Sequence, residues 1–221
     1  MARHKEPNLR KAAWIYRAGN VADVRALVEK HHYLRTIPGG SIQHVGTLRR
    51  KSAPDKIVAV SIWTWPNKPV ERWMQREYQV APGKGLNLSR LIAIPSAPRN
   101  TATHLMGRDM RALKQREFDG VVTYADGTEG HTGAIYRASN WTPAGEARAR
   151  PRWTHPKTGR TKTQLSAGRY VPVAEMRRLG YVRTMGKPKA RFVRGLNRGA
   201  QRDIAQRFQA QVRAATANKQ P

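Results

Sequence analysis

The sequence predicts a single α/β or α+β domain built on a mixed central sheet. Short β-branched runs alternate along the chain with amphipathic helical stretches, in the order helix, two or three strands, strand, helix, strand, helix and a final strand pair. With 221 residues and 39% hydrophobic content, the chain can bury one good core. We see no internal repeat, so one domain is the expectation.

The N-terminal part predicts a helix followed by a two-stranded meander. Asn20 can cap the helix, which should end near residue 31, before the breaker Pro38-Gly39-Gly40. Residues 41–48 and 56–65 are rich in apolar and β-branched side chains, which favours strands. Pro54-Asp55 is the expected turn between them.

The middle of the chain predicts a strand and helix pair and then a further strand. Residues 66–85 should be irregular, and the apolar run from 86 to 94 is a strand candidate ended by prolines. A helix should start just after Asn100 or Thr101, with one apolar and one basic face. Residues 121–124 form a short β-branched and aromatic run that indicates the next strand.

The C-terminal part is strongly basic. Residues 142–170 predict a long basic loop, and residues 181–183 and 190–193 predict a final hairpin around Gly186-Lys187-Pro188. Apolar residues at fourfold spacing after position 200 indicate a short amphipathic helix. We therefore expect a catalytic domain over residues 1–195, with the loop 142–170 inserted, and a basic helix and tail over 196–221.

The charge balance favours a nucleic-acid partner. Forty-two Lys and Arg against fourteen Asp and Glu give a net charge of +28, which repels itself unless a polyanion neutralises it. An acidic protein or an acidic membrane surface are the alternatives. The expected nucleic-acid contacts are Arg148, Arg150, Arg152, Lys157, Arg160, Lys162, Arg169, Lys187, Lys189 and Arg191. An alternative role for the loop cations is that they only keep an appendage solvated.

Two absences narrow the function classes. The chain contains no cysteine, which excludes thiol catalysis, disulfides and thiolate zinc sites. No apolar run approaches the roughly 20 residues that span a bilayer, so we expect a soluble, unexported protein that makes no membrane contact.

The segment 124–141 is the strongest candidate for a catalytic site. Asp126 should end a strand, and His131 and Tyr136 should lie on the following helix, so that an acid, an imidazole and a phenol converge. The plainer interpretation is that Asp126 caps the helix and that Tyr136 and Trp141 belong to the core. On composition alone the two interpretations have similar weight.

A second candidate site lies between the strand 86–94 and the helix after Asn100. The first turn of such a helix offers backbone N–H groups and a positive dipole end to phosphate. Arg90, Arg99 and Arg108 add formal charge around it. An ordinary capped helix with a solvated basic face is the alternative.

These motifs together resemble a known family. The motifs are His32-Tyr33-Leu34 before Pro38-Gly39-Gly40, Leu88-Ser89-Arg90-Leu91, Pro98-Arg99-Asn100-Thr101-Ala102-Thr103, Ala125-Asp126, His131-Thr132-Gly133-Ala134-Ile135-Tyr136 and Asn140-Trp141. Over roughly residues 31–141 the chain resembles the phage Mom-type DNA modification proteins. The resemblance implies a GCN5-related N-acetyltransferase (GNAT)-like fold with a mixed, mostly antiparallel sheet. It also implies a reaction on the exocyclic amine of adenine in double-stranded phage DNA, which becomes a carbamoylmethylated amine, in the host cytoplasm, as protection from restriction.

The donor site departs from the pattern of standard acetyltransferases. Their Q/R-x-x-G-x-G/A loop corresponds here to Arg99-Asn100-Thr101-Ala102-Thr103-His104, which lacks the glycines. The candidate donor-binding residues are Arg90, Arg99, Asn100, Thr101, Ala102 and Thr103. Acetyl coenzyme A and a glycyl- or aminoacyl-tRNA both remain open as donors.

The resemblance also suggests roles for individual residues. The target adenine must flip out of the duplex and stack on an aromatic ring. Tyr33 is the first candidate, and the others are Trp63, Trp65, Trp73 and Trp141. Asp126 is the expected general base, or it orients His131 or the amine, and Tyr136 is the expected donor of a proton to the leaving group. Arg90 and Thr103 would flank the donor, and capping is an equal alternative for Thr103. His32 and His131 complete the candidate catalytic set.

Other interpretations stay open at this point. His32, Asp126 and His131, with His31, could form a 2-His-1-carboxylate iron site, although their spacing gives no fixed helical pair. A conventional acyl-coenzyme A N-acetyltransferase acting on protein or small amines is one rival. A non-catalytic basic nucleic-acid-binding protein is another, and the sequence does not indicate an oligomeric state.

Overall fold

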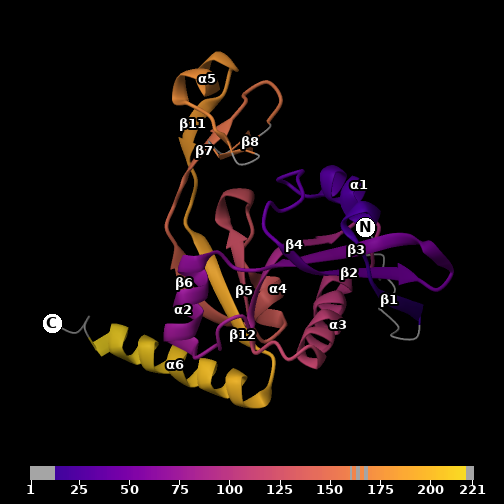
Figure 1. Ribbon diagram of the computed structural model, residues 1–221, viewed down its shortest axis with the longest axis vertical. Helices are drawn as coiled ribbons and strands as arrows, with labels where there is room; N and C mark the ends of the chain where they lie inside the picture. Colours follow the sequence, from indigo (N-terminus) through magenta and orange to yellow (C-terminus); the bar gives the residue numbers. More distant parts are fainter. Residues whose placement is uncertain (1–12, 160, 163–164, 167–168, 218–221) are drawn as a thin grey trace, which may run out of the picture.

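The computed structural model describes residues 13–159, 161–162, 165–166 and 169–217. Its centre is a seven-stranded sheet in the order β1-β2-β3-β4-β5-β12-β6 (Figure 1). The strands of this sheet are β1 (Trp14–Ala18), β2 (Ile42–Arg50), β3 (Ala53–Thr64), β4 (Gly85–Ala93), β5 (Gly120–Asp126), β6 (Thr142–Ala147) and β12 (Lys189–Gly195). Neighbouring strands are antiparallel except β4 and β5, which run parallel. The expected mixed, mostly antiparallel sheet is confirmed.

Helices cover both faces of this sheet. They are α1 (Val21–His31), α2 (Lys68–Tyr78), α3 (Thr101–Gln115), α4 (Ala134–Ala138) and α6 (Arg198–Ala217). On one face, α3 and α4 pack on a core that includes Trp63, Val121 and Phe192. On the other face, α1 packs on β2 and β3, while α2 and α6 pack on Val122 and Val193. Among the described residues, no helix is long and apolar enough to cross a membrane.

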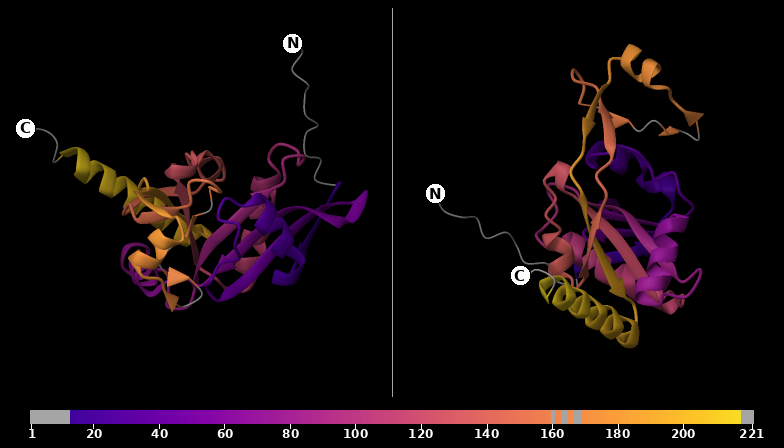
Figure 2. Two further views of the ribbon diagram at one scale, coloured as in Figure 1. Left: turned by 90° about the horizontal axis from the view of Figure 1, so that it is seen from above. Right: turned by 90° about the vertical axis from the view of Figure 1, so that its left-hand side faces the viewer.

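An arm projects from the sheet above the carboxyl end of β5. We use this name for residues 148–188, of which the described parts include β7 (Pro151–Thr154), β8 (Thr161–Lys162), β9 (Leu165–Ser166), β10 (Arg169–Tyr170), α5 (Val173–Arg178) and β11 (Val182–Met185). Figures 1 and 2 show it standing away from the body. Trp153, Met176 and Tyr181 form a small core at its tip.

The arm corrects two predictions. The basic stretch 142–170 is not simply a loop, because its described parts contain β6 and the strands of the arm. The final hairpin is also wrong, since β11 pairs with β7 while β12 pairs with β5 and β6. Gly186-Lys187-Pro188 therefore continues one strand direction instead of reversing it.

Other elements differ from the prediction in identifiable ways. Residues 66–85 are not irregular, because Asn67 caps α2 by accepting from the Val70 N–H at 3.0 Å. The turn after β2 lies at residues 51–52 instead of Pro54-Asp55, which belong to β3. The strand β1 was not predicted, and α6 is 20 residues long instead of short. The predicted caps at Asn20 and the helix start after Asn100 are confirmed.

A buried polar network holds α3 against the sheet. The Asp109 carboxylate is fully buried and accepts hydrogen bonds from Ser61 at 2.5 Å and from Tyr16 at 2.9 Å. His44 Nε2 lies 3.0 Å from the same carboxylate. Burial and the neighbouring Asp109 raise the pKa of Tyr16, so that its hydroxyl stays a donor. A Cβ at Gly46 would overlap the carboxylate, which explains the glycine there.

Candidate active site

The candidate site is an opening between β4 and β5. These parallel strands pair only over Gly85–Asn87 and Gly120–Val122, and Thr123 Oγ1 then donates to the Leu88 carbonyl at 3.2 Å. Beyond this bond the two strands have no paired residues. A register shift between β3 and β4 near Ser89 bends β4 at the same level. The end of pairing separates the two strands beyond Thr123 and leaves a gap between them.

Alternation along β5 sends its side chains to opposite sides of this gap. Val121 and Ala125 belong to the core under α3 and α4. Val122 and Tyr124 belong to the core under α2 and α6. Asp126, two residues after Tyr124, points to the same side as these two residues. We call the α3 and α4 side the pocket side and the opposite side the carboxylate side.

Asp126 is the centre of the carboxylate side. It is only 4% exposed and ends β5, as predicted. One carboxylate oxygen lies 2.8 Å from Lys189 Nζ and accepts from the Tyr33 hydroxyl at 3.4 Å, and the other accepts from the Thr128 N–H at 3.1 Å. Burial raises the pKa of Asp126, but Lys189 and Thr128 outweigh it and lower the pKa overall. The group is therefore a carboxylate at neutral pH.

His32 and Tyr33 come to Asp126 from the segment after α1. Their rings stack with centroids 4.5 Å apart, and Tyr33 meets His131 edge to face at 5.5 Å. Burial, with the charge of Arg90, lowers the pKa of His32 to about 3, and burial together with Asp126 raises the pKa of Tyr33. His32 is thus neutral and its Nδ1 accepts from the Leu34 N–H at 3.1 Å.

Arg90 fastens this segment to β4. Its Nε donates to the Thr36 carbonyl at 3.0 Å and its Nη1 to the Ser89 carbonyl at 2.7 Å. Burial lowers the pKa of Arg90, and the nearby Tyr33 opposes that shift. The structure therefore places Arg90 beside Tyr33 on the carboxylate side.

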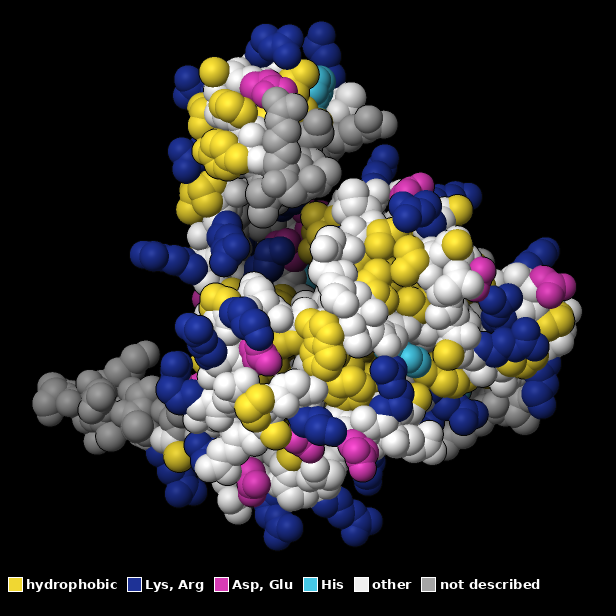
Figure 3. Space-filling model, viewed as in Figure 1, with side chains coloured by type: hydrophobic (Ala, Val, Ile, Leu, Met, Phe, Trp, Pro, Cys, Tyr) yellow, Lys and Arg dark blue, Asp and Glu magenta, His cyan; other side chains and the backbone are white. Residues whose placement is uncertain are grey.

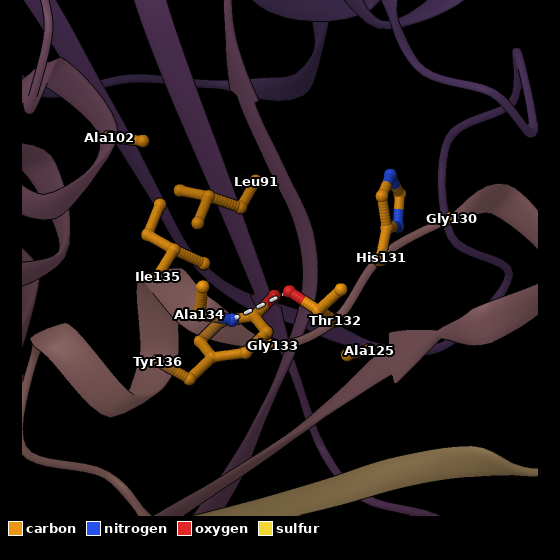
Figure 4. Close-up of a pocket in the computed structure, with 10 residues that line it drawn as sticks. All are labelled: Leu91, Ala102, Ala125, Gly130, His131, Thr132, Gly133, Ala134, Ile135 and Tyr136. Carbon is orange, nitrogen blue, oxygen red and sulfur yellow. Dashed lines mark hydrogen bonds between the residues drawn. The ribbon is translucent and has the colours of Figure 1, made fainter.

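The pocket side holds a cavity of about 350 Å³. It is lined by Leu91, Ala102, Ala125, Gly130, His131, Thr132, Gly133, Ala134, Ile135 and Tyr136 (Figure 4). Of the residues predicted to bind the donor, Ala102 lines the cavity. Arg99 and Asn100 are exposed just before α3, and Thr103 is half-buried in its first turn.

The start of α3 has an unusual conformation for a helix cap. Asn100 lies in the left-handed region at φ 68° and makes no side-chain capping bond. Thr101 instead donates its hydroxyl to the Pro98 carbonyl at 2.6 Å. Asparagine tolerates this backbone conformation, which glycine would otherwise supply. The first turn of α3 thus offers N–H groups without a side-chain cap beside the cavity.

Tyr136 connects the cavity with the gap between the strands. It packs against Trp141 and Phe192, and its hydroxyl hydrogen-bonds with Thr123, the residue at which β4 and β5 part. Burial raises the pKa of Tyr136, so the phenol keeps its proton. Gly133 precedes α4 at φ 75°, and a Cβ there would overlap the Phe192 ring.

The sequence predicted His131 on a helix, and this prediction is wrong. His131 lies in the loop between Gly130 and Gly133, before α4 begins. This loop position lets it line the cavity while its ring touches Tyr33 on the carboxylate side. The iron hypothesis gains no support: within the described ranges, no three His, Asp or Glu side chains form a group that could hold a metal. Two other candidates, Trp63 and Trp141, are core residues and not base-stacking surfaces.

The predicted nucleic-acid contacts separate into two groups. Arg152 pairs with Glu129 at 2.7 Å, Lys189 with Asp126, and Arg191 lies 4.1 Å over the Trp73 ring, so these three are engaged within the protein. Exposed residues of the set are Arg148, Arg150, Lys157 and Lys187. Arg160 and the side chains of Lys162 and Arg169 lie outside the described part of the chain.

Lys189 is a residue of the candidate site that the sequence did not place there. It was predicted to contact DNA, but the register of β12 with β5 sets it directly opposite Asp126. Its 63-residue separation from Asp126 carries no local signal, so only the strand pairing could have identified it.

The geometry defines a candidate site where β4 and β5 part, with a cavity on one face of the sheet and the Asp126 carboxylate on the other. The Mom protein family matches the chain over residues 15–210, and the chain belongs to this family. A search of curated proteins found no match.

Several solved acetyltransferases are similar in fold. The ribosomal-protein-S18-alanine N-acetyltransferase of Escherichia coli shares 11% identity, with 83% of this chain and 94% of that one covered and a TM-score of 0.47. NAA60 of Arabidopsis thaliana in complex with acetyl-CoA shares 11%, covering 82% and 98%, with a TM-score of 0.48. An N-acetyltransferase of Staphylococcus aureus shares 9%, covering 83% and 99%, with a TM-score of 0.46. These likenesses concern the course of the chain and not its substrate.

Proposed function

We propose that this protein modifies the exocyclic amine of adenine in DNA, by Mom-like carbamoylmethylation or acyl transfer, and so protects phage DNA from host restriction. The observation that carries the proposal is the cleft with two unlike sides, in a member of the Mom family. The Asp126 carboxylate faces one side and a cavity faces the other. This arrangement suits a reaction in which an amine and an activated donor approach one gap from opposite directions.

The carboxylate side is the proposed adenine site. Tyr33 offers an aromatic face, and Asp126 is an ionised acceptor within hydrogen-bonding distance of its hydroxyl. An adenine amine is a donor, so it can replace the long 3.4 Å contact from Tyr33 at that oxygen. Lys189 keeps Asp126 ionised and ready to accept.

The pocket side is the proposed donor site. A cavity of about 350 Å³ is at the small end of the usual range for ligand pockets, and Leu91, Ala125 and Ile135 give it apolar walls. The uncapped first turn of α3 beside it suits a phosphate group. These features fit an acyl-coenzyme A type of donor, which when bound would supply the activated carbon. A glycyl- or aminoacyl-tRNA is the alternative donor.

The protein's side chains then carry out the proton transfers. As the amine nitrogen bonds to the donor carbon, Asp126 accepts the proton that the nitrogen loses. Tyr136, whose pKa is raised by burial, gives its proton to the departing atom of the leaving group. Arg90 holds the Tyr33 segment in place through Thr36. His131, between the two sides, can orient either partner.

The decisive experiment is mass spectrometry of nucleosides from plasmid DNA made in bacteria that express this chain. We expect a mass-shifted deoxyadenosine and resistance to restriction enzymes whose sites contain adenine. Purified protein given plasmid DNA with acetyl-CoA, or with glycyl-tRNA, would identify the donor class. Unmodified nucleosides from cells that contain folded protein would refute the proposal in favour of a non-catalytic DNA-binding protein. Acetylation of proteins or small amines alone would favour a conventional N-acetyltransferase.

A further inference from the structure

The arm begins as one continuous two-stranded ribbon. Ala147 lies opposite Lys189 at the end of β6 and β12, and Pro151 lies opposite Met185 where β7 and β11 begin to pair. The Gly186 N–H donates to the Arg150 carbonyl at 3.2 Å between these pairs, which keeps the register constant. From Ala147 to Thr154 the ribbon extends roughly 23 Å, at about 3.3 Å per residue.

The base of this ribbon is bound to the candidate site. Directly after Asp126, the short helix η2 (Gly127–Glu129) contacts both of its strands. Thr128 Oγ1 accepts from the Lys187 N–H at 2.9 Å, and Glu129 pairs with Arg152 at 2.7 Å. The ribbon therefore has a fixed position next to the catalytic carboxylate.

The side chains on the outer part of the ribbon are exposed to solvent. All four residues of β11 are exposed, and Val182 and Met185 remain 54% and 65% exposed although they are apolar. Arg148, Arg150 and Arg183 are exposed along the same ribbon. Within residues 148–188 the sequence has a single acidic residue, Glu175. Figure 3 shows the arm bordering a hollow against the body, with basic side chains along it.

We propose that this ribbon enters the major groove of double-stranded DNA beside the target adenine. The major groove, about 12 Å wide, admits a two-stranded β-ribbon, and it displays the adenine amine that the proposed reaction modifies. Successive residues of a strand point to opposite faces, so Arg183 and Met185 share one face of the ribbon, which would contact a guanine edge and a thymine methyl group. Arg148 and Arg150 lie on the other face and would contact phosphates. The ribbon thus sets the sequence context in which adenine is modified. This inference rests on the proposed function.

The first test measures binding to a DNA duplex by fluorescence anisotropy at several salt concentrations. The ribbon variant carries Arg148→Gln, Arg150→Gln and Arg183→Gln. The matched control carries Arg72→Gln, Arg111→Gln and Lys114→Gln, which change three exposed cations on α2 and α3. We expect the ribbon variant to bind about tenfold or more weakly and to lose about 0.9 of salt slope per missing contact. Equal behaviour of the two variants would overturn the inference.

The second test separates the two grooves. Duplexes with bulky 5-substituted cytosines fill the major groove, whereas a minor-groove-binding dye leaves it free. We expect the first to weaken binding of the wild-type protein and the second to leave it unchanged. The opposite pattern would refute the ribbon's placement.

Sequence context gives a readout that simple loss of charge would not move. Met185→Ala keeps the charge, so the salt slope of DNA binding should stay as in the wild type while the preferred neighbours of modified adenines change. An unchanged context would overturn the specificity role. Wild-type protein that shows groove-dependent binding but leaves adenine unmodified would refute the proposed function and spare the ribbon. If the wild-type protein modifies adenine but the ribbon variant binds DNA as the control does, the ribbon inference is refuted and the proposed function stands.

Discussion

The contact between Gly46 and Asp109 allows a quantitative test of how α3 is held. Asp109→Ala removes the acceptor that Ser61, Tyr16 and His44 share in the buried network. Each buried polar group left without a partner costs about 1–3 kcal/mol, and breaking such a network typically costs about 3–5 kcal/mol in total. Gly46→Ala pushes a methyl group into the same carboxylate, at about 1–3 kcal/mol or more.

The double variant separates the two effects. Once the carboxylate is gone, most of the overlap with the new methyl group disappears, although Ser61 remains near it. The two costs should therefore fall short of additivity by about 1–3 kcal/mol, which is typical of residues in contact. Urea unfolding followed by tryptophan fluorescence measures all three free energies. Gly107→Ala, on the same helix with open space around it, is the control and should not destabilise the protein.

Additive costs would show that Gly46 serves some purpose other than room for Asp109. A loss below about 1 kcal/mol for Asp109→Ala would refute the network's importance. Because Ala102 on α3 lines the cavity that we propose as the donor site, a loosened α3 should also weaken donor binding in the singly substituted proteins.

Three further predictions concern the candidate site. Asp126→Asn and Tyr136→Phe should each reduce adenine modification by about 100-fold or more while duplex affinity stays unchanged; near-normal nucleoside mass spectra from both would refute the assignment. Lys189→Met should raise the pKa of Asp126 and move the acid limb of the activity profile to higher pH, whereas the exposed Lys187→Met should not; equal shifts would argue against the ion pair. His32 has a folded pKa of about 3 against a usual 6.5, so the unfolded chain binds the proton first. The stability that neutral His32 gives the folded state is complete above pH 6.5 and is lost as the pH falls toward 3. After allowance for solvent screening, the free energy of unfolding should fall by about 1 kcal/mol between pH 6.5 and pH 5. His32→Gln should flatten this part of the plot of unfolding free energy against pH.

The sequence predicted the elements whose signals are local. The strand ending at Asp126 was visible because a β-branched run meets turn residues, and the start of α3 was visible from Asn100 after two prolines. The helix α2 was missed because its charged residues obscure the buried spacing of Met74 and Tyr78. Local composition alone favoured a loop there.

Other features depend on contacts between distant segments. The pairing of Lys189 with Asp126 requires the register of β12 on β5, and no pattern near either residue encodes that register. The arm appeared as a loop because its strands are short and its small core consists of only a few apolar residues, among them Trp153 and Met176. Charge indicated a DNA partner, but the ribbon that could present this charge was not predictable.

The register of β5 decides which chemistry faces which side of the cleft. Because successive residues of a strand point to opposite faces, a slip of one residue would send Asp126 to the cavity and Ala125 to Tyr33. Two contacts oppose such a slip: the Thr123 bond to the Leu88 carbonyl, and the tight fit of Gly120 against Val80. The same Thr123 hydroxyl also meets Tyr136. Thr123 therefore joins the point where β4 and β5 part to the proposed proton donor, on a strand whose register its pairing with β12 also holds.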